Sequence, residues 1–267
     1  MKVLVTGVKG QLGFDVVNEL EKRGHTAIGV DVDTMDITNS EQVENVIKAN
    51  MPEAVIHCAA YTAVDLAEDN KELCDKINGE GTENIAKVCK EINAKLMYIS
   101  TDYVFDGQGD QPWHEYDKRY PLNEYGYSKY LGEQAVQKYV KDFYIVRIAW
   151  VFGINGKNFV KTMLNVGKNH DTVRVVNDQI GTPTYTFDLA RLLVDMIETD
   201  KYGIYHGTNE GGYISWYDFT CEIYRQAGYT TNVVPVTTEE YGLSKAKRPK
   251  NSRLDKSKLV DNGFKPL

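Results

Sequence analysis

The fold is decided at the start of the chain, by the stretch Lys2-Val3-Leu4-Val5-Thr6-Gly7-Val8-Lys9-Gly10-Gln11-Leu12-Gly13. Its first part is a short, mostly β-branched apolar run, which predicts a buried strand over residues 2–6. Leu12, Val16 and Leu20 then recur at helical spacing and predict a helix over residues 11–23. A glycine-rich turn therefore joins a strand to a helix, the unit that opens many dinucleotide-binding sheets.

The three glycines of this turn have separate expected roles. Gly7 permits the tight turn, Gly10 lets the backbone approach a pyrophosphate, and Gly13 lets the helix pack closely on the strand. The helix N-terminus adds N–H donors and a partial positive charge. Asp31 follows the next predicted strand, 26–30, where a carboxylate accepts hydrogen bonds from an adenosine ribose. We expect NAD or NADP to bind, with NADH slightly favoured because Asp31 would repel a 2′-phosphate.

The same alternation of strand and helix continues through the first half of the chain. Short apolar runs predict strands over 54–58, 95–100 and 143–149, and helical periods predict helices over 40–50, 70–92 and 126–139. Repeated units of this kind specify an α/β fold with a doubly wound parallel (Rossmann) sheet. After Trp150 the rhythm is less regular, with helices predicted over 157–167, 186–199 and 215–228 and a strand over 173–176.

The loss of the regular strand–helix alternation after Trp150 predicts a main domain and a smaller lobe. We expect residues 1–150 to form an NAD(P)-binding Rossmann domain, with later segments near 173–200 interleaved into it. Residues 151–267 should form mainly a smaller C-terminal α/β lobe that binds the substrate.

Composition excludes several classes of function. The formal net charge of −7 argues against a nucleic-acid-binding surface. The apolar neighbourhood 143–154 is interrupted by Arg147 and is shorter than the ~20 residues of a membrane span. Residues 1–7 are too short for a signal-peptide core, so we expect a cytoplasmic protein with no membrane partner. The four cysteines and five histidines are scattered without ligand spacing, so no metal site is predicted.

Tyr125 and Lys129 form the candidate chemical pair. They lie four residues apart at the start of a predicted helix, so their side chains share one face. A lysine ammonium near a phenol favours the phenolate, so we expect the pKa of Tyr125 to fall from about 10 toward neutrality. A tyrosine of this kind is an acid or base suited to carbonyl reduction.

Context separates this pair from the other Tyr-x-x-x-Lys pair, Tyr241 and Lys245. The second pair has no Rossmann strand after it and is interpreted as surface loop. The first lies between two predicted strands, and Thr101 follows the strand 95–100. Because ligands bind at the carboxyl ends of parallel strands, the Thr101 hydroxyl should lie at the same site.

This ordered set of glycines, hydroxyl, tyrosine and lysine resembles the extended short-chain dehydrogenase/reductase superfamily. Within it, nearly the whole chain is similar to the dTDP-4-dehydrorhamnose reductases. The strings that carry this resemblance are Gly10-Gln11-Leu12-Gly13, Cys58-Ala59-Ala60-Tyr61-Thr62-Ala63-Val64-Asp65, Ser100-Thr101-Asp102-Tyr103-Val104-Phe105-Asp106-Gly107, Arg147-Ile148-Ala149-Trp150, Asp178-Gln179-Ile180-Gly181-Thr182-Pro183-Thr184 and Arg248-Pro249-Lys250-Asn251-Ser252-Arg253-Leu254-Asp255.

The resemblance implies reduction of the 4-keto group of dTDP-4-dehydro-L-rhamnose to dTDP-L-rhamnose. Tyr125 would donate the proton, Lys129 would hold the nicotinamide ribose, and Thr101 would donate a hydrogen bond to the carbonyl oxygen. Asp102, Tyr103 and Trp150 would face the sugar. The residues implied to bind the cofactor are Gly7, Gly10, Gln11, Leu12, Gly13, Asp31, Asp36, Ile37, Ala59, Ala60, Tyr61, Tyr125 and Lys129.

The segment 244–253 holds five cations on an otherwise acidic chain. One interpretation is a solvated charge run; the other is a site for the substrate diphosphate, with Lys247 or Arg248 as its cation. We favour Arg248, because its planar fork suits phosphate oxygens.

Two other classes of function compete with this interpretation. A non-catalytic regulatory subunit, like the beta subunit of methionine adenosyltransferase, belongs to the same branch. Another nucleotide-sugar epimerase or dehydratase is the third choice, because these usually carry Gly-Phe-Ile-Gly in place of Gly10-Gln11-Leu12-Gly13. The resemblance also admits a homodimer. Asp15 matches a residue of magnesium-linked dimers only in charge, so neither that dimer nor a metal is predicted.

Overall fold

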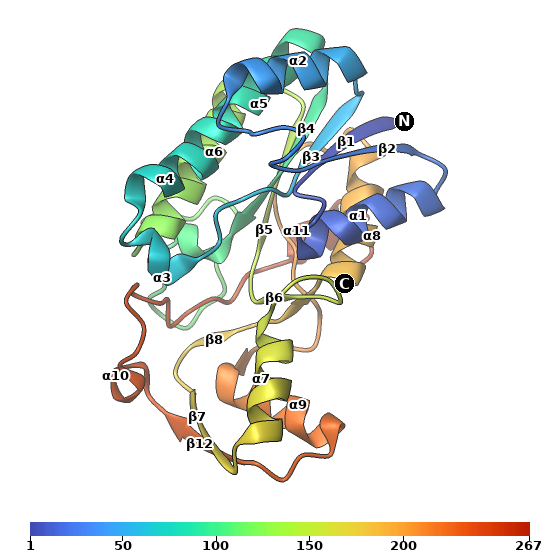
Figure 1. Ribbon diagram of the computed structural model, residues 1–267. Helices are drawn as coiled ribbons and strands as arrows, with labels where there is room; N and C mark the ends of the chain where they lie inside the picture. The colour runs from blue at the N-terminus through green and yellow to red at the C-terminus, as the bar shows by residue number, and fades with distance from the viewer.

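A six-stranded sheet forms the centre of the computed structural model, which describes residues 1–267 (Figure 1). All of its neighbouring strands are parallel, in the order β10-β5-β4-β3-β1-β2. The strands are β1 (Lys2–Thr6), β2 (Thr26–Val30), β3 (Ala54–His57), β4 (Lys95–Thr101), β5 (Phe143–Ile148) and β10 (Gly203–His206). The predicted α/β class with a doubly wound parallel sheet is confirmed. The order of strands reverses at β1, so the carboxyl ends of β1 and β3 open a crevice for a ligand.

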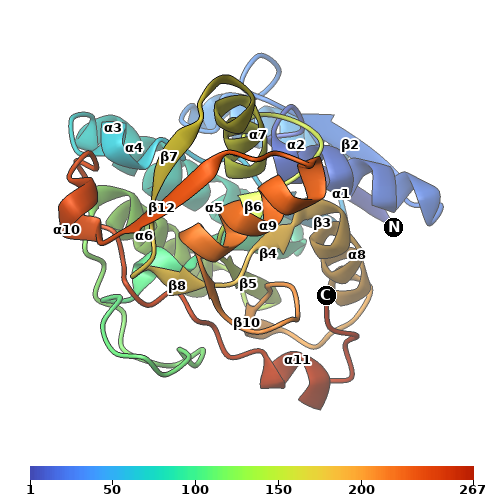
Figure 2. The ribbon, with the colours of Figure 1, turned by 90° about the horizontal axis from the view of Figure 1, so that it is seen from below.

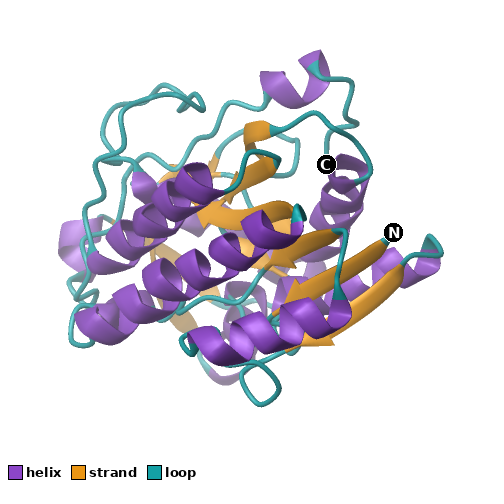
Figure 3. Ribbon diagram, turned by 90° about the horizontal axis from the view of Figure 1, so that it is seen from above, coloured by secondary structure: helices purple, strands orange, loops and turns teal.

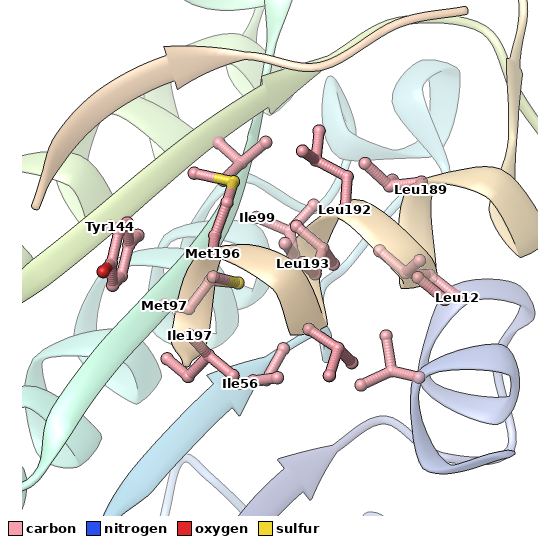
Figure 4. Packing of buried hydrophobic residues seen from close by; sticks show 14 of the residues in the cluster. Leu12, Ile56, Met97, Ile99, Tyr144, Leu189, Leu192, Leu193, Met196 and Ile197 are labelled. Carbon is pink, nitrogen blue, oxygen red and sulfur yellow. The ribbon is translucent and has the colours of Figure 1, made fainter. Parts of the chain in front are cut away.

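Helices cover both faces of this sheet (Figure 3). On one face lie α1 (Gln11–Lys22) and α8 (Thr186–Ile197), which pack against each other. On the other lie α2 (Ser40–Asn50), α5 (Gly81–Ile92) and α6 (Glu124–Tyr139). Successive strand residues serve opposite faces, since Val3 and Val5 join the core under α1 and α8 whereas Leu4 joins the other core. Figure 4 shows the first core, where the leucines of α8 meet Ile56, Met97 and Ile99.

The predicted helix 70–92 is divided in the structure. It becomes α4 (Lys71–Asp75), a π-helical turn (Lys76–Glu80) and α5, and it is preceded by the short α3 (Val64–Ala67). The π-helical turn carries Asn78, whose side chain is bonded away from the helix: its Oδ1 accepts from the Tyr61 backbone N–H at 2.8 Å. Such local interruptions of an α-helix occur often at functional sites.

A small lobe lies beyond the carboxyl edge of the sheet (Figures 1 and 2). Its larger sheet pairs β7 (Thr172–Val176) with β12 (Asn232–Val236) in parallel, beside α7 (Phe159–Asn169) and α9 (Trp216–Ala227). Its other elements are short: β6 (Val151–Phe152) with β9 (Thr184–Tyr185), β8 (Ile180–Gly181) with β11 (Ile214–Ser215), and α10 (Thr238–Tyr241). Two further short elements pack with the main sheet and its helices, α11 (Ser257–Asp261) beside β10 and the 3-10 turn η2 (Asp102–Val104) beside α6.

The chain passes back and forth between the two parts. Within the segment near 173–200, β7 pairs in the lobe whereas α8 returns to pack on α1. The chain then adds β10 beside β5, a strand that the sequence analysis did not predict. None of the helices combines the length and the apolar character that a membrane span requires.

Candidate active site

One cavity of about 1130 Å³ lies between the carboxyl edge of the sheet and the lobe. Most of the residues singled out from the sequence line it: Gly7, Gly10, Gln11, Leu12, Asp31, Asp36, Ile37, Ala59, Ala60, Thr101, Asp102, Tyr103, Tyr125, Lys129, Trp150 and Arg248. Gly13 and Tyr61 are not among the lining residues. Segments far apart in the sequence therefore converge on a single site.

The glycine turn is shaped by close backbone contacts. Gly7 has a φ of 70°, and a Cβ there would lie 2.8 Å from the Ala59 Cα. Gly13 packs against the Gly7 carbonyl, with which a Cβ at this position would collide, so only glycine fits there. Gly10 caps α1 without a side-chain bond, and a Cβ there would meet only the Gly7 oxygen, at 3.1 Å. The first turn of α1, which no side chain caps, thus offers N–H donors that fit a dinucleotide pyrophosphate.

The adenosine end of the cavity carries both signs of charge. The Asp31 carboxylate accepts the Lys9 backbone N–H at 2.9 Å and the Val32 N–H at 2.9 Å. The Lys9 ammonium lies 2.8 Å from Asp33 Oδ2. A ribose here would meet an acceptor at Asp31, with an exposed cation nearby.

Tyr125 and Lys129 are placed by the first turns of α6. Asn123 caps this helix, since its Oδ1 accepts the Gly126 N–H at 2.8 Å. The Tyr125 ring meets the Tyr103 ring edge-on, with the centroids 5.6 Å apart. Lys129 is 3% exposed, and its Nζ lies 4.1 Å from the Tyr98 ring centroid. Both side chains line the cavity from one face of the helix.

Burial controls the protonation of this pair. It raises the pKa of Tyr125 well above its ordinary value; the Asp102 carboxylate adds to this effect and the Thr101 side chain opposes it. Burial also lowers the pKa of Lys129 to about 7, against the attraction of Glu133. The prediction that Lys129 brings the pKa of Tyr125 toward neutrality is wrong, because the desolvation of both groups outweighs their proximity. Tyr125 instead holds its proton at neutral pH and is an acid with a proton to give.

Thr101 and Asp102 end β4 beside the tyrosine. The Thr101 hydroxyl donates to Asp102 Oδ1 at 2.9 Å and accepts the Tyr103 N–H at 3.2 Å. Asp102 Oδ2 is buried without a hydrogen-bond partner, and burial raises the pKa of this carboxyl to about 6. An unpaired acceptor of this kind suits a hydroxyl group of a ligand.

Three aromatic side chains, Trp150, Trp216 and Phe159, form an aromatic wall on the side of the cavity that faces the lobe. Trp150 has a φ of 50°, in the left-handed region, and its ring stacks on Trp216 with the centroids 3.7 Å apart. Trp216 and Phe159 also line the cavity, and the sequence analysis missed both. The available signal for Trp216 was its place directly after Ser215, which begins a helix with a capping box.

Most of the basic segment is occupied by ion pairs. Lys245 pairs with Asp69, and Lys250 lies 3.1 Å from Asp178. Arg248 lines the cavity, where its guanidinium lies 2.8 Å from Asp65 Oδ2 and donates to the Tyr103 hydroxyl at 3.3 Å. Arg248, and not Lys247, therefore lines the cavity.

The comparison with known proteins agrees with this geometry. Residues 1–267 match the model of the RmlD substrate binding domain family. The chain belongs to this family.

Its RmlD-family relatives cover almost its whole length. The spore coat polysaccharide biosynthesis protein SpsK of Bacillus subtilis is 40% identical over 99% of this chain and 93% of its own. A dTDP-4-dehydrorhamnose reductase of Streptomyces griseus is 39% identical over 99% of this chain and 88% of its own. The crystal structure of the dTDP-4-dehydrorhamnose reductase of Bacillus anthracis, in complex with NADP, superposes with a TM-score of 0.96 at 43% identity, covering 100% of this chain and 95% of that one.

Asp15 has a structural role in this chain. Asp15 is buried and accepts a hydrogen bond of 2.5 Å from the Thr186 hydroxyl, which ties α1 to α8. No group of three or more His, Cys, Asp or Glu side chains is placed to hold a metal ion.

Proposed function

We propose that this chain reduces the 4-keto group of dTDP-4-dehydro-L-rhamnose to give dTDP-L-rhamnose, with NADH or NADPH as the reductant. The observation that carries the proposal is the placement of Thr101, Tyr125 and Lys129 in one cavity with the glycine turn of β1 and α1. The names of the relatives supply the sugar nucleotide. Residues 1–150 would hold the dinucleotide, and residues 151–267 would hold mainly the sugar nucleotide.

The glycine turn and Lys129 would hold the nicotinamide cofactor, which would supply the hydride for the ketone carbon. The chain supplies the proton: Tyr125 Oη gives it to the ketone oxygen, so that one hydride and one proton complete the alcohol. The Thr101 hydroxyl donates to Asp102 Oδ1 in this structure, and it would turn its hydrogen to the ketone oxygen as negative charge develops there. The Lys129 ammonium, one helical turn from Tyr125, orients the nicotinamide ribose and favours the charge left on the phenol oxygen.

The remaining cavity residues fit the sugar nucleotide. The unpaired Asp102 Oδ2 is an acceptor for a sugar hydroxyl. The stacked Trp150 and Trp216 offer an apolar wall for the sugar ring and the base. Arg248 holds Asp65 and Tyr103 in this structure, and the substrate diphosphate would replace Asp65 as its anionic partner.

The cofactor preference is part of the proposal. Asp31 disfavours a 2′-phosphate by charge repulsion, so NADH should be used at least as well as NADPH, although the Lys9 cation softens the discrimination. Asp31→Asn removes the repulsion and should raise kcat/KM for NADPH relative to NADH by about tenfold, which corresponds to ~1.4 kcal/mol. If steady-state kinetics show an unchanged ratio of kcat/KM for NADPH to that for NADH, Asp31 does not discriminate against the 2′-phosphate.

The direct test is oxidation of NADH and NADPH by the purified protein in the presence of dTDP-4-dehydro-L-rhamnose. Identification of dTDP-L-rhamnose as the product supports the proposal, and the UDP-linked keto sugars serve as controls for base recognition. If no keto sugar supports oxidation, the reductase proposal fails and the regulatory-subunit interpretation replaces it.

A further inference from the structure

A fully buried ion pair lies behind the candidate catalytic helix. Glu133 of α6 and Arg147 of β5 are both 0% exposed. They bond in parallel, since Arg147 Nε donates to Glu133 Oε1 at 2.7 Å and Nη2 donates to Oε2 at 2.8 Å. The paired geometry is the strongest that a guanidinium and a carboxylate can form.

The ion pair joins the elements that carry the site. The Ser100 hydroxyl, next to Thr101 on β4, donates to Glu133 Oε1 at 2.6 Å. Arg147 Nη1 donates to the Glu115 carbonyl oxygen at 2.8 Å, and the guanidinium lies 5.0 Å from the Phe105 ring centroid. One pair therefore fixes α6, β4, β5 and the loop after η2 relative to one another.

Stability alone does not account for such a pair. Replacing a buried ion pair by apolar residues of similar volume is often neutral or stabilising, because both charges lose their hydration. Two charges at this position therefore call for another explanation.

The position of Glu133 supplies one. It follows Lys129 by one helical turn and Tyr125 by two, so the three side chains share a face of α6. The groups that face Lys129 from other elements are His57 at the end of β3, Cys58 directly after it, Cys74 of α4 and Tyr98 of β4. Burial lowers the pKa of His57 to about 3 and raises the pKa of each of the two thiols and of the phenol, so these groups are neutral at pH 7. Glu133 is the carboxylate among the groups that act on Lys129.

We propose that Glu133, held by Arg147, is a positioning residue for the reduction: it sets α6 against the sheet and favours the charged form of the Lys129 amine. This inference rests on the proposed function, because it gives the Lys129 charge a task in turnover. Glu133 does not line the cavity and acts through Lys129.

The test replaces the pair by apolar residues of similar volume, Glu133→Leu with Arg147→Met, so that folding is retained without either charge. Turnover should fall as pH rises through the Lys129 pKa, because the neutral amine no longer stabilises the reacting tyrosine. In the double variant this alkaline limb of kcat should move to lower pH by about one unit or more. Glu133→Gln, which keeps Arg147, should move it in the same direction.

The matched control is Glu19→Leu with Arg23→Met. Glu19 of α1 and Arg23, directly after this helix, form an i,i+4 ion pair of 2.7 Å away from the cavity. This variant should change thermal stability and leave the pH profile unchanged.

A second measurement separates this inference from the proposed function. The 13Cε signal of Lys129, assigned by comparison with Lys129→Met, reports the titration of the amine without any turnover. A lower midpoint in the folded double variant than in the wild type supports the inference even if no keto sugar is reduced. An unchanged midpoint, or an unchanged alkaline limb in an active double variant, overturns it and leaves the pair a structural one.

Discussion

The two walls of the cavity are built by different means. The phosphate wall uses backbone: the glycine turn and the uncapped first turn of α1 form it, and close contacts between main-chain atoms fix its shape. The chemical wall uses side chains: Thr101 and Lys129 are buried, Tyr125 is half-buried, and the helix α6 and the end of β4 hold all three. The first wall should therefore respond to added volume, and the second to the loss of single functional groups.

The largest expected effect is on the chemical wall. Tyr125→Phe removes the proton donor and keeps the ring that packs on Tyr103, so kcat should fall by about 10³- to 10⁴-fold. Cofactor affinity, measured by fluorescence titration with NADH, should change by no more than a few-fold. Turnover near the wild-type rate would show that the proton comes from another group.

The next largest effect is expected on the phosphate wall, where added volume should weaken cofactor binding. Gly7→Val places a side chain against the Ala59 backbone and forces a β-branched residue to a φ of 70°, which together cost about 3 kcal/mol or more. The variant should bind NADH at least about a hundredfold more weakly, and its thermal midpoint should fall. Gly24→Val is the control, because Gly24 has a φ of 78° with open space around it. It should lose stability without losing affinity.

A smaller effect is expected from the aromatic wall, which belongs to the lobe. Trp216→Ala removes the ring that stacks on Trp150, so KM for the sugar nucleotide should rise by about tenfold, with kcat within a few-fold. Tyr217→Ala, the next residue on α9, serves as the control. A large fall in kcat with an unchanged KM would contradict a role in substrate binding.

The sequence predicts the features that local patterns encode, and it misses those that depend on contacts between distant segments. The bounds of β1 and β2 follow from the sequence because each strand is a short apolar run between polar turns. The meeting of Thr101 with Tyr125 also follows, because parallel strands bring their carboxyl ends to one edge. β10 was missed, since its four residues are recognised as a strand only through pairing with β5, far away in the sequence.

The lobe and the protonation states depend on tertiary structure in the same way. Trp216 lines the cavity only because the lobe places the start of α9 across from the carboxyl edge of the sheet (Figure 1), a contact that depends on tertiary structure. The π-helical turn carries Asn78, whose side chain bonds to the Tyr61 backbone, a contact that the local sequence pattern does not predict. The spacing of Tyr125 and Lys129 predicts their shared face but not the burial that decides their pKa values.

The smallest effect concerns stability, and it follows from the cost of burying Lys129. Burial lowers the pKa of this amine from 10.5 to about 7, so the unfolded chain binds more protons than the folded one between these values. The free energy of unfolding should therefore rise with pH in this window, and below about pH 7 the folded protein carries the full cost of the buried charge. Lys129→Met removes the charge and fills a similar volume, so it should raise the thermal midpoint at pH 6 by a few degrees, since about 1 kcal/mol shifts the midpoint by ~2–4 °C in a chain of this size. The difference from wild type should shrink as the pH approaches 10, while turnover is lost at every pH. A variant less stable than wild type at pH 6 would contradict this. It would mean that the Lys129 ammonium is hydrated or paired in the folded protein.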